Sequence, residues 1–291
     1  MKCLVTGGKG FIGTHLVERL IKDKNDVVIL DIHDNFDIKD YDTVDVFAKD
    51  VDIIFHLAAV VGVEQASANP LKVMDTELKG TKNVLEAAIN NSVRKVVYAS
   101  SSEVYGGSLK FPLREDESAA PLSTYGVSKL ACEHMCNAYY EKKGLQTSSL
   151  RIFNAYGPRQ DDRFVVPKFI RAATFIGKIP IYNDGAQTRD FTYIDDVIEA
   201  FIKAAEGPPG QVFNVATGRE TSIRVLAEKI AGMINPRPKF EYIRPINRKP
   251  EFEIPRRVGD INKSKNSLLF EAKTSLEEGL KLTIPERTAV I

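Results

Sequence analysis

The sequence predicts an α/β protein built on a doubly wound parallel sheet, with a second, smaller lobe. Short apolar segments alternate with amphipathic helical segments through the first half of the chain, a pattern typical of parallel strands covered by helices. A glycine-rich turn joins the first predicted strand to the first helix, and polar residues gather after a later strand. With 291 residues, the chain is long enough for both parts.

The elements expected in the first half are strand Lys2–Thr6, helix Phe11–Lys22, strands Val27–Asp31 and Asp52–His56, helix Pro70–Asn90, strand Lys95–Ser100, helix Ser123–Lys143 and strand Thr147–Ile152. After Asn154 the pattern is less regular. It predicts helix Pro167–Gly177, a strand near Thr192, helix Asp195–Glu206, strand Val212–Val215, helix Ser222–Ile234 with Ser222 as N-cap, and a last helix around Leu276–Lys281. We therefore expect residues 1–153 and 190–217 to form the sheet domain, and residues 154–189 and 218–291 the lobe.

Composition favours a cytoplasmic protein without nucleic-acid or membrane partners. The 40 Lys and Arg residues balance 39 Asp and Glu residues, so no net basic charge supports nucleic-acid binding. No apolar run approaches the ~20 residues of a membrane helix, and the first residues enter a strand without a leader pattern. Three cysteines cannot pair completely, which fits a reducing compartment. We expect Cys132 and Cys136, one helical turn apart, to be buried thiols rather than metal ligands.

A glycine loop between the first strand and helix predicts a Rossmann-type dinucleotide site. Gly7, Gly10 and Gly13 are spaced G-x-x-G-x-x-G, which allows a tight turn and close approach of backbone N–H groups to a pyrophosphate. Asp31 ends the next strand, where a carboxylate can accept hydrogen bonds from ribose hydroxyls and would repel a 2′-phosphate. The prediction is NAD rather than NADP. The alternatives are an ordinary glycine-rich turn and a turn-forming Asp.

Tyr125 and Lys129 predict proton-transfer chemistry. They are four residues apart on an expected helix, so their side chains share one face. A nearby ammonium lowers the pKa of a phenol and makes tyrosinate accessible as a base near neutral pH. The pair follows a strand that ends in the polar run 100–106 (SSSEVYG), and active sites of open α/β sheets lie at such strand ends.

Seven segments, in order along the chain, carry a family resemblance: TGGKGFIG at 6–13, FHLAA at 55–59, SSSEVYG at 100–106, YGVSK at 125–129, RIFNAYGP at 151–158, DGAQTRDFTYIDD at 184–196 and DINKSKNSLLFEAKTSLEEGL at 260–280. They resemble an extended short-chain dehydrogenase/reductase of the NAD-dependent nucleotide-sugar epimerase/dehydratase group, similar to UDP-glucose 4-epimerase. The resemblance runs nearly end to end, which makes it specific.

The resemblance implies a role for each matching residue. Ser101, Tyr125 and Lys129 would be catalytic, with Glu103 beside them, and Ser101 would hydrogen-bond the reacting sugar oxygen. The implied cofactor residues are Gly7, Gly10, Phe11, Ile12, Gly13, Asp31, Asp37, Ile38, Leu57, Ala58, Ala59, Ser100, Tyr125 and Lys129. The implied substrate residues are Asn154, Val165, Arg189 and one of Arg256 or Arg257. Guanidinium groups suit a diphosphate because they bind its oxygens in a bidentate manner. For Arg189 the alternative is a surface salt bridge.

Three departures from the family pattern stand out. The segment between Asp31 and Asp37 is too short for the usual helix and strand, because a parallel crossover needs about a dozen residues. We expect one outer strand to be missing and the adenosine pocket to be altered. Glu77 stands where an Asn usually precedes x-x-Gly-Thr, and Val61 replaces a polar residue near the nicotinamide. Both put cofactor affinity in question.

The implied first step is oxidation at C4 of the sugar, with Tyr125 taking the hydroxyl proton and NAD the hydride. The 4,6-dehydratase pattern is Thr-Asp-Glu, whereas this chain has Ser101-Ser102-Glu103 and lacks the acid. The Thr-Ser-Glu pattern of UDP-glucuronate decarboxylases matches better, but their Arg before the catalytic Tyr is replaced by the run 121–124 (PLST). We therefore predict a 4-epimerase. Decarboxylase-like or dehydratase-like chemistry using Glu103 is the alternative, followed by a non-catalytic NAD-binding sensor. A purely structural Glu103 would be hydrogen-bonded within its own loop.

The resemblance also implies partners. UDP is the commonest nucleotide among the substrates of this group, so a UDP-sugar is expected. Helices 70–90 and 123–143 resemble the pair through which family members form dimers, and we expect a homodimer.

Overall fold

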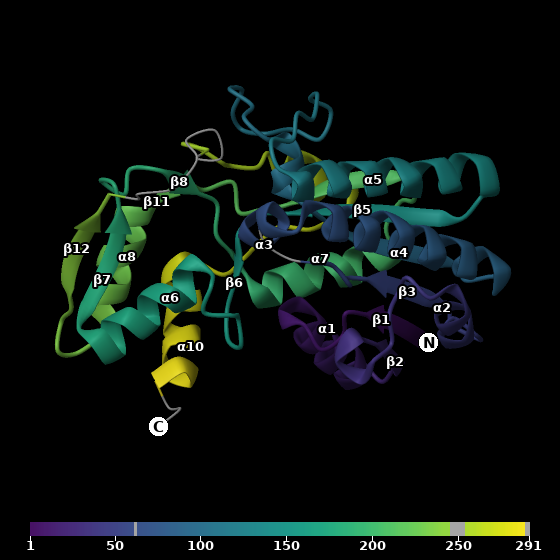
Figure 1. Cartoon of the computed structure of the whole chain (residues 1–291), viewed down its shortest axis with the longest axis horizontal. Helices are drawn as coiled ribbons and strands as arrows, with labels where there is room; N and C mark the ends of the chain where they lie inside the picture. The colour runs from purple at the N-terminus through teal and green to yellow at the C-terminus, as the bar shows by residue number, and fades with distance from the viewer. Residues whose placement is uncertain (61–62, 245–253, 289–291) are drawn as a thin grey trace.

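A six-stranded parallel sheet forms the centre of the molecule (Figure 1). The structure is a computed structural model that describes residues 1–60, 63–244 and 254–288. The sheet consists of β1 (Lys2–Thr6), β2 (Asp26–Leu30), β3 (Ile53–His56), β4 (Lys95–Ser101), β5 (Gln146–Ile152) and β10 (Gln211–Val215), in the order β10-β5-β4-β3-β1-β2. β1, β3 and β4 are buried along nearly their whole length, as strands covered on both faces must be. The predicted fold class is confirmed.

Helices cover both faces because strand side chains alternate in direction. Leu4, Ile54 and Val96 share one buried cluster with α2 (Tyr41–Phe47), α4 (Pro70–Asn90) and α5 (Thr124–Lys143). Their neighbours Val5 and Val97 face α1 (Phe11–Lys22) and α7 (Ile194–Glu206) in another cluster. A short helix, α3 (Val63–Ala68), packs against α4 and α5.

The expected loss of one outer strand is confirmed. Between β2 and β3 the chain forms a 3₁₀ turn, η1 (Ile32–Asp34), and α2, which the sequence analysis did not anticipate. No strand lies in residues 31–52, all of which are described, so β2 is the edge of the sheet.

A smaller group of elements lies at one side of the sheet, on the left of Figure 1. It contains α6 (Val165–Arg171), continued by a π-helical turn η3 (Ala172–Ile176), α8 (Ile223–Met233) and α10 (Leu276–Thr288), with a parallel strand pair β7 (Lys178–Tyr182) and β12 (Lys239–Ile243). Ser222 caps α8 as expected, because its hydroxyl accepts a hydrogen bond from the Val225 N–H. The strands β7 and β12 were not predicted.

Short elements connect the two parts. β6 (Ala155–Tyr156) pairs with β9 (Thr192–Tyr193), and β8 (Thr188–Arg189) pairs with β11 (Thr221–Ser222). The 3₁₀ turn η2 (Ser102–Tyr105) follows β4, and α9 (Asn262–Ser267) packs against β10. The chain motifs 151–158 and 184–196 therefore lie where the sheet meets the smaller group.

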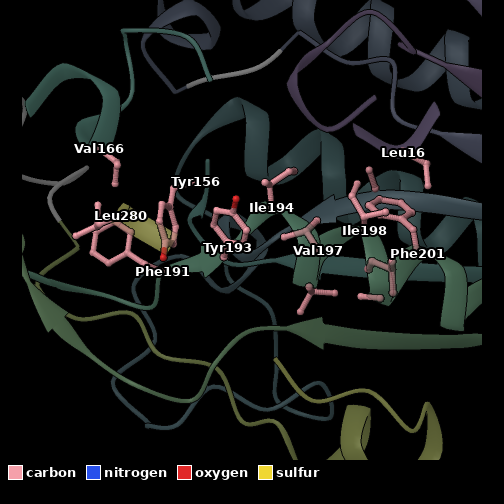
Figure 2. Close-up of a cluster of buried hydrophobic side chains, with 14 of the residues drawn as sticks. Leu16, Tyr156, Val166, Phe191, Tyr193, Ile194, Val197, Ile198, Phe201 and Leu280 are labelled. Atoms are coloured by element: carbon pink, nitrogen blue, oxygen red, sulfur yellow. The ribbon is translucent and has the colours of Figure 1, made fainter. Parts of the chain in front are cut away.

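One hydrophobic core runs through both parts (Figure 2). Tyr156 packs edge-on against Phe191 and Tyr193, with ring centroids 6.3 and 5.6 Å apart. Leu280 of α10 lies beside these rings, and Phe201 of α7 extends the cluster under the sheet. Continuous burial of this kind holds the smaller group at a fixed place beside the strand ends.

The three cysteines are free and buried, as expected for Cys132 and Cys136. None of the helices in the described ranges has the length and apolar character needed to cross a membrane.

Candidate active site

The loop after β1 requires glycine at two of its three predicted positions. Gly7 has a φ of +71°, and a Cβ there would lie 2.7 Å from the backbone nitrogen of Ala58. A Cβ at Gly13 would lie 2.1 Å from the Gly7 carbonyl oxygen, so the helix can approach the loop only without a side chain. Gly10 is the N-cap of α1 and offers no side-chain acceptor. The first N–H groups of α1, at Phe11, Ile12 and Gly13, are therefore available to an anion.

Asp31 is buried and folded onto its own loop. One carboxylate oxygen accepts the Lys9 N–H at 2.8 Å, and the other accepts the backbone N–H and the Nδ1 of His33 at 3.0 and 2.7 Å. Burial alone would raise its pKa, but the hydrogen bonds from His33 and Lys9 outweigh burial and hold the pKa below the usual value. Asp31 thus stays charged, and it caps the turn that follows β2.

The segment that replaces the missing strand is fastened to α4. The Ile38 carbonyl accepts a hydrogen bond from Asn83 Nδ2 at 3.0 Å. The Ile38 side chain lies against Gly80, where a Cβ would be 2.2 Å from Ile38 Cδ1. Asp37 accepts the Lys39 N–H at 2.9 Å. On the other side of the loop, the half-buried residues 57–59 follow β3, and the Ala58 N–H donates to Thr6 Oγ1 at 3.2 Å.

Ser101 and Tyr125 come together where β4 ends and α5 begins. Ser123 caps α5 by accepting the Gly126 N–H at 3.1 Å. The absence of a side chain at Gly126 lets the helix start lie against η2, since a Cβ there would be 2.6 Å from the Glu103 carbonyl oxygen. This close contact brings the Tyr125 phenol within hydrogen-bonding reach of the Ser101 side chain.

The charge around Tyr125 differs from the sequence prediction. Burial raises the pKa of this phenol, Lys129 lowers it, and Glu77 and Glu103 raise it further, so that the pKa lies above its usual value. A lowered pKa was expected from Lys129 alone. The prediction was wrong for this ligand-free chain because it included neither burial nor the carboxylate of Glu77.

Lys129 is buried in an ion pair with Glu77. Its Nζ lies 3.0 Å from Glu77 Oε2 and donates to the Ala99 carbonyl at 3.0 Å. The two side chains are 2% and 0% exposed. The other carboxylate oxygen of Glu77 accepts the Val60 N–H at 3.1 Å. Burial would lower the pKa of Lys129, but Glu77 outweighs burial and raises it. The lysine is therefore charged, and Glu77 belongs to the cluster of Tyr125 and Lys129. Val61 lies outside the described residues.

Glu103 and Arg257 form a second ion pair beside Ser101. Both terminal nitrogens of Arg257 contact the Glu103 carboxylate, Nη2 at 3.2 Å, and the Arg257 side chain is only 4% exposed. The idea that Glu103 bonds within its own loop was wrong, because its carboxylate partner comes from a segment 154 residues away. Sequence reasoning missed this pairing, although it had singled out both residues.

The remaining predicted substrate residues have separate surroundings. Arg256, next to Arg257, turns away to Glu220 at 2.6 and 2.8 Å and stacks on Phe111. Arg189 donates from Nη1 to the carbonyls of Thr188 and Ile254, so it braces the backbone beside Arg257. Asn154 Oδ1 is buried and has no hydrogen-bond partner among the described residues. Val165 is half-buried at the first position of α6. The unpaired Oδ1 of Asn154 has acceptor capacity that a donor of a ligand could use.

A family model described as the NAD dependent epimerase/dehydratase family matches residues 3–216. The chain belongs to that family. A UDP-N-acetyl-alpha-D-glucosaminuronate decarboxylase of Bacillus cytotoxicus is 35% identical, over 97% of this chain and 96% of the relative. A UDP-glucose 4-epimerase of Mycolicibacterium smegmatis is 36% identical, over 98% of this chain and 97% of the relative. A crystal structure of UDP-glucose 4-epimerase with UDP-glucose from Thermotoga maritima superimposes with a TM-score of 0.92 at 33% identity, over 98% of both chains.

Membership of the epimerase/dehydratase family confirms the predicted NAD-dependent enzyme. The residues of this chain fit the cofactor. The glycine loop is a cradle that a Cβ would fill, and the N-terminus of α1 carries N–H groups without a capping side chain.

Proposed function

We propose that the protein is an NAD-dependent nucleotide-sugar 4-epimerase that works through a transient 4-keto sugar, with UDP as the nucleotide. The observation that carries this proposal is the contrast between the two candidate acid–base groups. The Tyr125 phenol lies within reach of Ser101, with Lys129 Nζ 5.6 Å from its ring centre, whereas the Glu103 carboxylate is bound by Arg257. Epimerisation at C4 needs one group that removes and returns a proton, and Tyr125 is placed for it.

The cofactor residues follow from the loop geometry. The N–H groups of Phe11 and Ile12 would bind the pyrophosphate of NAD, and Asp31 the ribose of its adenosine. Lys129 would hold the ribose next to the nicotinamide. NAD held there would supply the hydride acceptor and donor that a change of configuration at C4 requires. Tyr125 takes the C4 hydroxyl proton and gives it back, and Ser101 orients the oxygen that loses it.

We assign the substrate diphosphate to the smaller group of elements, residues 154–189 and 218–291. Asn154 would contribute its side-chain NH₂ group, which can donate to a phosphate oxygen, whereas its buried Oδ1 is an acceptor and would need a donor such as a sugar hydroxyl. Arg189 and Arg256 lie on the same side, and Arg256 is exposed enough to exchange Glu220 for a phosphate. Arg257, by contrast, faces the catalytic end of the site through Glu103.

A decarboxylase acting on a UDP-uronate is the second candidate, and the Glu103–Arg257 pair favours it. A buried guanidinium next to the catalytic Ser101 could bind a sugar carboxylate in place of Glu103. The released Glu103 would then be free to act on the sugar ring. The relative in Bacillus cytotoxicus, whose name is that of a uronate decarboxylase, supports keeping this reaction in view.

Product analysis by NMR and mass spectrometry separates the candidates. The purified protein is incubated with NAD and, in turn, UDP-galactose, UDP-N-acetylglucosamine, UDP-glucuronate and dTDP-glucose. A product of unchanged mass with inverted C4 is expected. Loss of carbon dioxide from UDP-glucuronate would replace the epimerase by the decarboxylase, and loss of water would indicate a dehydratase. If none of the four sugars reacts, the epimerase proposal falls and the non-catalytic NAD-binding sensor becomes the leading alternative.

The catalytic assignment is tested by Tyr125→Phe. We expect this variant to bind NAD normally and to lose turnover, because the ring stays and the proton-transfer group goes. The matched control is Tyr140→Phe in a more exposed part of the same helix, which should turn over normally. Turnover that survives in Tyr125→Phe would rule out the phenol as the base.

We also propose a homodimer through α4 and α5. Both helices carry exposed apolar side chains, among them Leu71, Val127 and Tyr140. Light scattering at low micromolar concentration should give twice the mass of the 291-residue chain, and a monomer alone would exclude this interface.

A further inference from the structure

We propose that Glu77 is a positioning residue that sets the ionisation of Tyr125 through Lys129, and that it shifts the working range of the enzyme to higher pH than an amide would. The inference rests on the proposed use of Tyr125 as the base. It also gives the departure from the family's Asn at this position a chemical consequence.

The carboxylate of Glu77 is held in place on both sides. Oε2 lies 3.0 Å from Lys129 Nζ, and Oε1 accepts the Val60 N–H. The backbone carbonyl of Glu77 accepts a hydrogen bond from Cys132 Sγ at 3.4 Å, which ties α4 to α5 at the same level. With 0% exposure, Glu77 cannot exchange Lys129 for solvent while the helices stay packed.

The pair changes the charge that Tyr125 meets. Lys129 Nζ lies 5.6 Å from the centre of the Tyr125 ring, where an unpaired ammonium would favour the phenolate. Glu77 is paired with that ammonium, and its negative charge opposes this attraction by repelling the phenolate. Ionisation of Tyr125 then creates a net negative cluster, whereas with an amide at position 77 the cluster would become neutral.

Among the described residues, the other titratable groups that face the cluster do not take over the role of the Glu77 charge. Burial, with Lys129 adding to it, lowers the pKa of His56 to about 3, so this histidine is neutral. Burial raises the pKa of Tyr98 and of Cys132, which are neutral as well. On η2, Glu103 is paired with Arg257. The prediction takes Lys129 as charged when Glu77 is replaced, with the Ala99 carbonyl and the face of Tyr98 as its remaining partners.

The test is a titration of Tyr125 that does not depend on turnover. The near-ultraviolet absorbance of tyrosinate is followed against pH in the cofactor-free protein, and the curve of the matching Tyr125→Phe protein is subtracted. Glu77→Asn restores the usual family residue, and Glu77→Gln keeps the length of the side chain. In both we expect the pKa of Tyr125 to fall by about one unit, a tenfold change in its ionisation constant. The pH dependence of kcat in these variants should also move to lower pH, together with the pKa of Tyr125.

The control is Glu86→Gln, which removes a half-exposed carboxylate from the same helix and should leave the titration of Tyr125 unchanged. An unchanged or higher pKa in the two Glu77 variants overturns the proposal, as does an equal shift in the control. If both variants fail to fold, the absorbance titration of the wild-type protein still tests the proposal. Ionisation of Tyr125 near neutral pH in that titration would refute the role of Glu77. If no sugar reacts, the proposed function fails while the titration still stands.

Discussion

Neutralising Glu133 should destabilise the whole protein, because this residue ties α5 to the sheet. Its carboxylate accepts hydrogen bonds from Arg151 Nε at 3.0 Å and Nη2 at 2.8 Å, and from the Ser100 hydroxyl. Both charged side chains are about 95% buried, at 4% and 5% exposure. Glu133→Gln keeps the shape and leaves the Arg151 charge buried without its counterion.

The expected loss follows from that burial. Breaking one partner of a buried ion pair costs about 3–5 kcal/mol. The usual unfolding entropy per residue, scaled to 291 residues, is about 0.6 kcal/mol/K. The melting temperature should therefore fall by about 5–8 °C. Because α5 also carries Tyr125, we expect kcat to fall in the same variant even at temperatures where it is folded.

Thermal unfolding followed by circular dichroism provides the measurement. The matched control is Asp116→Asn, which breaks the exposed Arg114–Asp116 pair and should leave the melting temperature close to that of wild type. The double variant Glu133→Leu with Arg151→Met removes both charges and should recover most of the loss. A melting temperature within about 2 °C of wild type for Glu133→Gln, or a double variant less stable than the single one, would refute this reasoning.

Two further predictions concern the cofactor loop and the response to acid. In Gly13→Ala the new Cβ meets the Gly7 carbonyl oxygen at 2.1 Å, so the loop must open, and calorimetry should show NAD binding weakened at least about tenfold. Gly232→Ala, where a Cβ meets nothing within 4 Å, should bind NAD normally. Burial, together with Lys129, holds the pKa of His56 at about 3, below the value of about 6.5 of an unfolded chain. Its contribution to stability is therefore full above pH 6.5 and is lost as the pH falls toward 3. In the His56→Gln variant, the melting temperature should change less with pH between 6.5 and 3 than it does in the wild type. Replacement of the exposed His134 should not reduce this pH dependence. The same pH dependence in His56→Gln and in the wild type would contradict the assignment.

The sequence predicted the features that depend on local spacing. The glycine loop, the pairing of Tyr125 with Lys129 on one helix face and the missing outer strand all follow from residue types at short intervals. β7 was missed because Pro180 lies at its centre, and proline argues against a central strand although an edge pair tolerates it.

The electrostatics of the site could not be predicted in the same way. Glu77 and Glu103 meet their partners only after α4, α5 and the segment around Arg257 have packed at the strand ends. Nor could the sequence separate Arg256 from Arg257, because adjacent residues of an extended segment point to opposite sides. Whether a carboxylate attracts, repels or stabilises depends on these partners and on burial, and both are products of the tertiary fold.

The missing strand indicates where this architecture tolerates the loss of chain length during evolution. An outermost strand pairs with one neighbour only, so the pairing of β1 with β2, from Lys2 opposite Asp26 to Thr6 opposite Leu30, forms without it. Deletion of an inner strand would break two pairings. The cost is a newly exposed edge of backbone, which a flat, long strand would turn into a template for aggregation. With five residues and a charged residue at its exposed start, β2 keeps that hazard small.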